Sequence, residues 1–476
     1  MELINESLIL SSENITFKIS EFKFEKKIFV NEILGVNKKF GYSSLVKYNN
    51  INYIYYRDDT VSKKNKPEHE TTKRLIIKDV FDIVDDETFS LNLGIASHNF
   101  RLFNINNNIY GVGGQALGSK NHNEFINTTN EKYAEYNRSD VFIGSSHYNI
   151  NHLIGKYLFD PNIPCPYYAN GLYLFEFNND NVTELNNKLP ILSGVKNGRH
   201  DGAYGNSNGS NSGLSVFDST TNILYNDKEK KYFLYQRANF GLGIRNIQYC
   251  TSYDLLEWSD FNLVEYNPPM SYSHYNIYYG NFFKLDGVNN YIAIIPFNQK
   301  LKGGYQGLDP HEYFELRYSK DCITWDYIGL LDRHLYYTLW MIIGEPILFN
   351  NNYYFYFHNT DDKSIIIKSV EKNRFSYFKS IENHLAKILF KPTLIKNNKI
   401  IINFKTYENG FLKIQLLDSD QKIIEGYSLD DFDIIQECIN DTDYCVSWNK
   451  ETNINIENEV YIQLEGVNFE LFSINI

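Results

Sequence analysis

The apolar and polar positions of this chain follow the pattern of short β-strands. Apolar and aromatic residues form short runs, such as 53–57 and 231–237, and Asn, Asp or Gly residues separate the runs. Runs rich in Tyr and Phe and bounded by turn residues are typical of strands that are half-buried. We therefore expect a mostly β structure.

The strands recur as a repeated pair. An apolar strand is followed by a short polar turn and then by a second strand dense in Tyr and Phe. Five such pairs are present, at 42–48 with 53–57, 98–103 with 109–113, 217–227 with 231–237, 279–283 with 291–295, and 345–349 with 353–357. Repetition of one β unit predicts a five-bladed β-propeller, in which the first strand of each blade lines a central channel.

Two further segments share the form Ser-x-Asp-x-x-x-Trp. They span residues 252–258 and 319–325. The polar residues suit a turn between outer strands, and the large indole of Trp258 and of Trp325 suits packing between neighbouring blades. We interpret both motifs as marks of the fold and not of the chemistry.

Two regions depart from the repeat. A long excursion from about residue 114 to 213 interrupts the second blade and ends in a Gly/Asn/Ser-rich stretch at 205–210. Long loops in compact folds are commonly functional, so we expect it to rim a pocket. After about residue 385 the strands become shorter and are separated by Asn-Gly and Asp-Ser turns, which favours a β-sandwich. The predicted units are a propeller at 1–384 and a smaller sandwich at 385–476.

Composition excludes several classes of function. The formal net charge of -12 does not suit a partner with a phosphate backbone, so nucleic acid is not expected. The 5 cysteines are scattered and include no CxxC pair, which predicts neither a disulfide framework nor a zinc site.

No basic segment precedes an apolar stretch at the N-terminus, and no run approaches the roughly 20 apolar residues of a membrane span. We expect synthesis in the cytoplasm and no membrane span, while the final location and the oligomeric state stay undetermined.

Several motifs in order resemble one known group of proteins. They are 97–100 (Ser-His-Asn-Phe), 171–175, 217–219 continuing to 235–237, the two Trp motifs, and 391–392 with 426–428. Over nearly its whole length the chain resembles the five-bladed propeller glycoside hydrolases, the broad group that includes families 32 and 43. The resemblance implies a glycan substrate, hydrolysis of a glycosidic bond, a C-terminal accessory sandwich, and acidic residues at the starts of the innermost strands. It implies no organic cofactor.

Glycosidic hydrolysis needs two carboxyl groups, because the leaving oxygen must be protonated while the sugar carbon is attacked. Asp218 matches an acidic position of the group, where the residue orients the acid and tunes its pKa; the alternative is that Asp218 caps its own turn. Glu345 follows Gly344 at the start of a repeat and is the candidate general acid; the alternative is an ion pair with a neighbouring blade.

The chain departs from the group at two of its acidic positions. Residues 97–99 (Ser-His-Asn) and 278–280 (Tyr-Tyr-Gly) stand where the group carries acids. One interpretation is that other acids contribute, with Asp58, Asp201 and Glu315 as candidates. The other is that the propeller only binds, either as a glycan-binding protein or as a structural surface component, for instance of a virion.

The candidate binding residues are polar side chains near the strand starts. His98 is a candidate for binding sugar hydroxyls or for acid catalysis, and a structural hydrogen bond across blades is equally compatible. Asn99 suits hydroxyls because its amide both donates and accepts. Arg57, Arg237 and Arg245 suit either an anionic sugar or, as we favour, carboxylates between blades.

The long excursion carries Arg199, His200 and Asp201, of which His200 and Asp201 are candidate lid groups for the substrate, although solvated loop residues would look the same. No EF-hand and no dense Asp cluster is present, so we predict no dedicated metal site. A single ion in the channel remains compatible with the sequence.

Overall fold

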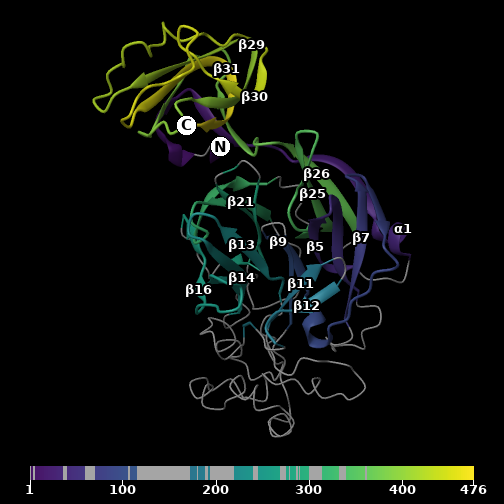
Figure 1. Cartoon of the computed structure of the whole chain (residues 1–476). Coiled ribbons are helices and arrows are strands. Elements are labelled where there is room, and N and C mark those ends of the chain that lie inside the picture. Colours follow the sequence, from purple (N-terminus) through teal and green to yellow (C-terminus); the bar gives the residue numbers. More distant parts are fainter. Residues whose placement is uncertain are drawn as a thin grey trace.

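The chain is almost entirely β-structured (Figure 1). The computed structural model describes residues 2–3, 6–35, 40–58, 70–105, 108–114, 172–178, 181–187, 191–192, 219–239, 245–268, 275–277, 279–285, 288, 290–299, 313–331, 339–359 and 362–476. Within them the single α-helix is α1 (Val30–Leu34), and two short 3-10 turns, η1 (Glu6–Leu8) and η3 (Gly94–Ser97), accompany it. The predicted all-β class is confirmed.

Five sheets of similar design form the propeller. In each, the chain runs back and forth from an inner strand to outer ones, as the repeated strand pairs predicted. Blade I contains β5 (Gly41–Tyr48), β6 (Ile51–Asp58), β7 (Thr71–Asp79) and β8 (Asp82–Asp85). Blade II contains β9 (Arg101–Ile105), β10 (Asn108–Gly113), β11 (Tyr173–Asn178) and β12 (Asn181–Glu184). Blade III contains β13 (Asn222–Asn226), β14 (Lys231–Asn239), β15 (Arg245–Ser252) and β16 (Asn262–Leu263).

Blades IV and V follow the same plan with additions. Blade IV contains β19 (Asn281–Lys284), β20 (Tyr291–Gln299), β21 (Tyr313–Ser319) and β22 (Thr324–Leu330), joined by β17 (Glu265–Asn267) and β18 (Tyr275–Asn276). Blade V contains β23 (Leu339–Ile342), β24 (Ile347–Phe349), β25 (Asn352–Asn359), β26 (Ser364–Glu371) and β4 (Lys23–Phe29). Because β4 comes from the N-terminal part of the chain, strand pairing between distant segments closes the ring of five blades.

The inner strand of blade V is divided at Gly344. This glycine has a φ of +68°, and a Cβ on it would lie 2.5 Å from the backbone nitrogen of Leu45 on β5. Only a residue without a side chain allows that approach and that backbone conformation. Gly344 therefore permits the close contact between blade V and blade I, and it sets the position of Glu345.

The two Trp motifs have the structural role that the sequence indicated. Trp325 is fully buried, and its ring centroid lies 4.9 Å from that of Phe282 on β19. Tyr235 of blade III stacks on the same Phe282 at 3.9 Å, so the aromatic cluster joins blades III and IV. Trp258 packs with residues of blades II and III, and its indole N–H donates to the carbonyl of Leu255.

A second β unit contains both ends of the chain (Figure 1). Its eight strands are β1 (Glu2–Leu3), β2 (Ile9–Glu13), β3 (Ile15–Ile19), β27 (Ser376–Ser380), β28 (Ala386–Phe390), β29 (Ile401–Leu417), β30 (Asn440–Cys445) and β31 (Tyr461–Asn475). It encloses its own apolar core, which includes Ile402, Leu412 and Leu464. A propeller with a smaller β unit is thus confirmed, whereas the boundary at 384/385 stays a prediction; strands β1–β3 and β27 also pair in this unit.

Candidate functional site at the propeller channel

The five inner strands give the channel two distinct ends. We call the end where β5, β9, β13, β19 and β23 begin the head end, and the end where β5, β9, β13, β19 and β24 finish the tail end.

Within the described residues, no group of three or more His, Cys, Asp or Glu side chains is placed to hold a metal ion. Nor does any helix of the described residues have the length and apolar character to cross a membrane.

Buried polar side chains gather at the head end. The buried residues at the strand starts of four blades are Ser43 and Ser44, Ser97 to Asn99, Ser219 to Asn222, and Asn281. One or more residues farther along, the same strands turn apolar, with Leu45, Leu102, Ile223 and Phe282 in the core. Burying a polar group is costly unless it is hydrogen-bonded, so this polarity requires partners.

Four of these partners form a closed ring between blades I and II. The Arg57 guanidinium donates from Nη1 to Oδ1 of Asn99 at 2.6 Å, and Nδ2 of Asn99 lies 3.2 Å from Nε2 of His98. Nδ1 of His98 lies 3.0 Å from both carboxylate oxygens of Glu70. Glu70 is in turn 3.6 Å from Nη1 of Arg57, which completes the ring.

The donor directions assign one neutral tautomer to His98. If the Glu70 carboxylate accepts the Nδ1 proton, Nε2 has a free lone pair, and the Asn99 amide donates to it. Arg57 then donates to both of its neighbours and Glu70 accepts from both of its neighbours, while Asn99 and His98 each accept on one side and donate on the other. The ring brings the predicted residues His98, Asn99 and Arg57 together. Glu70 was missed, because it stands alone at the start of β7 with no motif around it.

The head end of blade III holds part of the predicted site. Asp218 lies outside the described residues, and the four residues after it are buried. Oγ1 of Thr221 accepts a hydrogen bond from Nε2 of Gln236 at 3.0 Å, and the backbone N–H of Arg237 donates to Oε1 of Gln236 at 2.9 Å. Arg237 is buried beside this pair. Its role toward a substrate stays a prediction.

Three other predicted residues have no described side chain. Arg245 is placed by its backbone at the start of β15, opposite Asn239 of β14. His200 and Asp201 lie outside the described residues, as does the central part of the excursion at 115–171. Their proposed roles at the site stay predictions.

A buried arginine joins the starts of inner strands at the head end. Arg101, at the start of β9, donates from Nη2 to Oδ1 of Asn281 at 2.6 Å, and Nδ2 of Asn281 donates to the carbonyl of Gly344. These bonds tie blades II, IV and V. Burial lowers the pKa of Arg101 to about 10, whereas the charge of Glu345 and the Tyr279 hydroxyl act to raise it. The sequence contained no signal for this arrangement.

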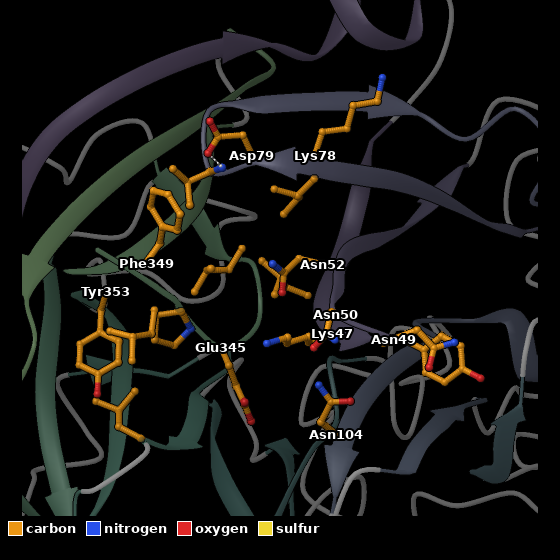
Figure 2. Close-up of a pocket in the computed structure, with 18 of the residues that line it drawn as sticks. Lys47, Asn49, Asn50, Asn52, Lys78, Asp79, Asn104, Glu345, Phe349 and Tyr353 are labelled. Atoms are coloured by element: carbon orange, nitrogen blue, oxygen red, sulfur yellow. Dashed lines mark hydrogen bonds between the residues drawn. The ribbon is translucent and has the colours of Figure 1, made fainter. Parts of the chain in front are cut away.

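Glu345 opens toward the tail end of the channel. It is half-buried and lines a pocket of about 1040 Å³ formed where the inner strands of blades I, II, IV and V finish. Figure 2 shows Glu345 extending into the same space as Lys47 and Asn104. Its electrostatic partner Arg101 supports the ion-pair interpretation between blades. A catalytic pairing with Asp218 stays a prediction.

The two other acids described are placed differently. Asp58 is buried at the end of β6, at the head end of blade I. Glu315 lies on β21, the third strand of blade IV, where Nε and Nη2 of Arg317 both approach its Oε2 at 2.7 Å. Burial raises the pKa of Glu315, and Arg317 opposes that rise. An acid on a third strand does not line the channel, so Glu315 is part of an ion pair within its blade.

Comparison with known proteins gives matches to solved structures only. No family model matches the chain, and no curated protein matches it. An arabinoxylan arabinofuranohydrolase of glycoside hydrolase family 43 from Bacillus subtilis is 10% identical, with 92% of this chain and 96% of that chain covered and a TM-score of 0.40.

Two further solved structures are similar to the same degree. A family 117 glycoside hydrolase from Zobellia galactanivorans is 10% identical, with 75% and 90% covered and a TM-score of 0.37. A GH43_1 enzyme from Xanthomonas citri is 10% identical, with 71% and 88% covered and a TM-score of 0.36. All three of these solved structures are glycoside hydrolases.

Proposed function

We propose that this protein binds a glycan at the head end of the channel and hydrolyses a glycosidic bond there. The observation that carries the proposal is the gathering of buried polar side chains at the starts of four inner strands. Sugars present many hydroxyls, so a site for them needs convergent donors and acceptors. The buried carboxylates Glu70 and Asp58 lie at this end, and Asp218 directly precedes its blade III part.

The proposed chemistry uses two carboxyl groups at the head end. Asp218 is the first, in the orienting or acid role. Glu70 is the second, because it already accepts hydrogen bonds at its oxygens, as a carboxylate that attacks the sugar or activates a water would. Glu345 opens toward the other end and faces Arg101, which supports a counter-ion role instead of a general acid.

The remaining candidates would contact the substrate. His98 and Asn99 are proposed to exchange their mutual hydrogen bond for bonds to sugar hydroxyls. Arg237 and Arg245 would approach from blade III, and His200 and Asp201 from the excursion. This assignment makes the ring of Arg57, Asn99, His98 and Glu70 a set of groups held ready for a ligand.

The test is turnover by matched acid variants. Wild type, Asp218→Asn, Glu70→Gln and the exposed control Glu87→Gln are assayed on a panel of chromogenic aryl glycosides and on plant, algal and microbial polysaccharides. We expect Asp218→Asn and Glu70→Gln to lower kcat by roughly 10²–10⁴-fold, and Glu87→Gln to leave it unchanged. Turnover that is equal in wild type and Asp218→Asn rejects the assignment of Asp218.

A second function is favoured by one specific observation. The ring at the head end satisfies its own members, Glu345 is matched by Arg101, and Asp58 also has an interaction partner, so these three channel carboxylates all have protein partners. A propeller that only binds a glycan, as a recognition or surface component, fits this arrangement. Saturable binding of a polysaccharide with no release of reducing ends, in wild type and in Asp218→Asn alike, would establish binding without hydrolysis.

A further inference from the structure

The pocket at the tail end, which we call the tail-end pocket, is polar and open. It has a volume of about 1040 Å³ and is bordered by the ends of inner strands and by the turns after them. Lys47 comes from β5, Asn50 from the β5–β6 turn, Asn52 from β6, Lys78 from β7 and Asn104 from β9. Figure 2 shows the side chains of Lys47, Asn50, Asn52 and Asn104 gathered on one side of this space.

The charges of this pocket do not cancel one another. Lys284 is paired with Asp227, whereas Asp79 accepts a hydrogen bond from the neutral backbone N–H of Val80 and keeps its negative charge. Glu345 interacts with the buried Arg101. This leaves Lys47 and Lys78, whose ammonium groups make no hydrogen bond or ion pair with any described residue. Two ammonium groups thus stand against the single carboxylate of Asp79, and the pocket keeps an excess of positive charge in a chain whose net charge is -12.

The amides of the pocket are also uncommitted. The side chains of Asn50, Asn52 and Asn104 have no hydrogen-bond partner among the residues that the structure describes. Each amide presents donors and an acceptor in fixed geometry, which matches the hydroxyls of a sugar. An ammonium alone would bind any anion, whereas three amides beside it favour an anion that also carries hydroxyls.

The rim of the pocket adds an apolar surface. Phe349 and Leu348, at the end of β24, are 44% and 41% exposed, and both line the pocket. A flat aromatic ring next to polar groups suits the C–H face of a pyranose. Together with the free lysines and amides, this surface matches one ligand class, a sugar that bears a carboxylate.

We propose that the tail-end pocket is a second binding site, specific for acidic oligosaccharides such as those built from uronic acids. In the bound state Lys47 pairs with a carboxylate, Asn50, Asn52 and Asn104 exchange hydrogen bonds with hydroxyls, and Phe349 covers one sugar face. Lys78, whose ammonium extends away from these groups in Figure 2, adds positive charge at the rim. The site is distinct from the one proposed for hydrolysis, because its lining comes from the ends of the inner strands and the turns after them, and the head-end residues come from the strand starts.

Isothermal titration calorimetry on the full chain tests this site. The probes are trigalacturonate and its fully methyl-esterified counterpart, which keeps the hydroxyls and loses the charges. We expect saturable binding of trigalacturonate that weakens as the ionic strength rises, because exposed charge pairs are screened. The methyl ester is expected to bind at least about tenfold more weakly.

Variants locate the binding. Lys47→Met/Lys78→Met is expected to weaken trigalacturonate binding about tenfold or more, and Asn104→Ala provides a second, uncharged change in the same pocket. The control is Lys228→Met, since Lys228 is exposed in the β13–β14 turn at the same end of the propeller and does not line the pocket. Circular dichroism and Tm establish that each variant is folded.

Three results would overturn the proposal. The first is no saturable binding of trigalacturonate by the wild-type chain. The second is binding that Lys47→Met/Lys78→Met and Asn104→Ala leave unchanged, which would place it elsewhere. The third is equal displacement by inorganic phosphate, which would show a site for any anion. Loss of trigalacturonate binding in an Asp218→Asn variant would also contradict the independence of the two ends.

Discussion

The two ends of the channel use polar side chains in opposite ways. At the head end, Arg57, Asn99, His98 and Glu70 bond to one another and are largely shielded from water. At the tail end, Lys47 and Asn104 face an open pocket and bond to no described residue. The five strands are the same, so the difference arises from the segments that flank them. The turn at Asn49 and Asn50 after β5 leaves its side chains exposed, whereas Ser97 to Asn99 before β9 are buried.

The comparison separates two kinds of energetic role. A buried polar group that loses its partner keeps the cost of desolvation, so changes at the head end and in the channel should lower stability. A free, exposed group carries no such cost. Changes at the tail end should therefore alter ligand binding and leave folding intact.

The largest effect is expected at Arg101. Arg101→Met removes the partner of Asn281 and leaves Glu345 without its charge partner, so we expect a loss of about 3–5 kcal/mol in the free energy of unfolding, measured by urea denaturation. Arg101→Met/Glu345→Gln should recover part of that loss, because the uncompensated charge is gone. A loss below about 1 kcal/mol in the single variant would contradict the role given to Arg101.

The next effect is a pH dependence from His358. This residue is buried on β25, edge-on to Phe40, and burial lowers its pKa from 6.5 to about 4, with the charge of Asp362 acting in the other direction. Between pH 6.5 and 4 the unfolded chain binds a proton that the folded chain does not, so the free energy of unfolding falls as the pH falls through this window. The contribution is up to about 3 kcal/mol.

Comparing wild type with His358→Asn isolates that contribution, because other acids titrate in both proteins. Urea denaturation at several pH values from 7 down to about 4 should show a shallower decline in the variant. Parallel declines in the two proteins would mean that His358 is protonated when folded.

A smaller loss is expected in the head-end ring. Glu70→Gln keeps the size of the side chain and removes the charge that His98 and Arg57 share, so we expect a destabilisation of about 1–3 kcal/mol, measured by thermal and urea unfolding. Asn92, which donates to the backbone carbonyl of Glu70, is unaffected by this change. An unchanged free energy of unfolding in Glu70→Gln would show that Glu70 does not bond to His98 and Arg57 in solution.

The smallest effect on stability is expected at the tail end. Lys47→Met should change the free energy of unfolding by no more than about 0.5 kcal/mol, because its side chain has no partner to lose. The same variant is expected to weaken trigalacturonate binding. Destabilisation comparable to that of Glu70→Gln would remove the contrast between the two ends.

Much of the fold was predictable because it rests on local signals. Runs dense in aromatic residues marked the strands, and Asn-rich turns marked their ends: Asn49 and Asn50, like Asn350 and Asn351, adopt the positive φ that tight hairpin turns require. The Trp motifs indicated blade packing, which Trp325 confirms. The part of the site that motifs indicated, His98 and Asn99, also lies at the head end.

The features that sequence reasoning missed depend on contacts between distant segments. Glu70 and His98 are 28 positions apart in the sequence, and Arg101 and Asn281 are 180 positions apart. No local sequence pattern therefore predicts either contact. The pairing of β1 to β3 with the C-terminal strands joins the two ends of the chain in the same way. Glu345 is an example. The sequence placed it at the start of a repeat, but it did not show that Glu345 lines the pocket at the tail end of the channel.

Strand periodicity and turn chemistry act over a few residues, so the sequence alone was enough to predict the β class, the five blades and a further β unit. The folded chain was needed to show which polar groups close on one another at the head end and which stay free at the tail end. Hydrogen bonding and burial at these positions depend on the convergence of five blades around one channel, and that convergence is a property of the assembled ring.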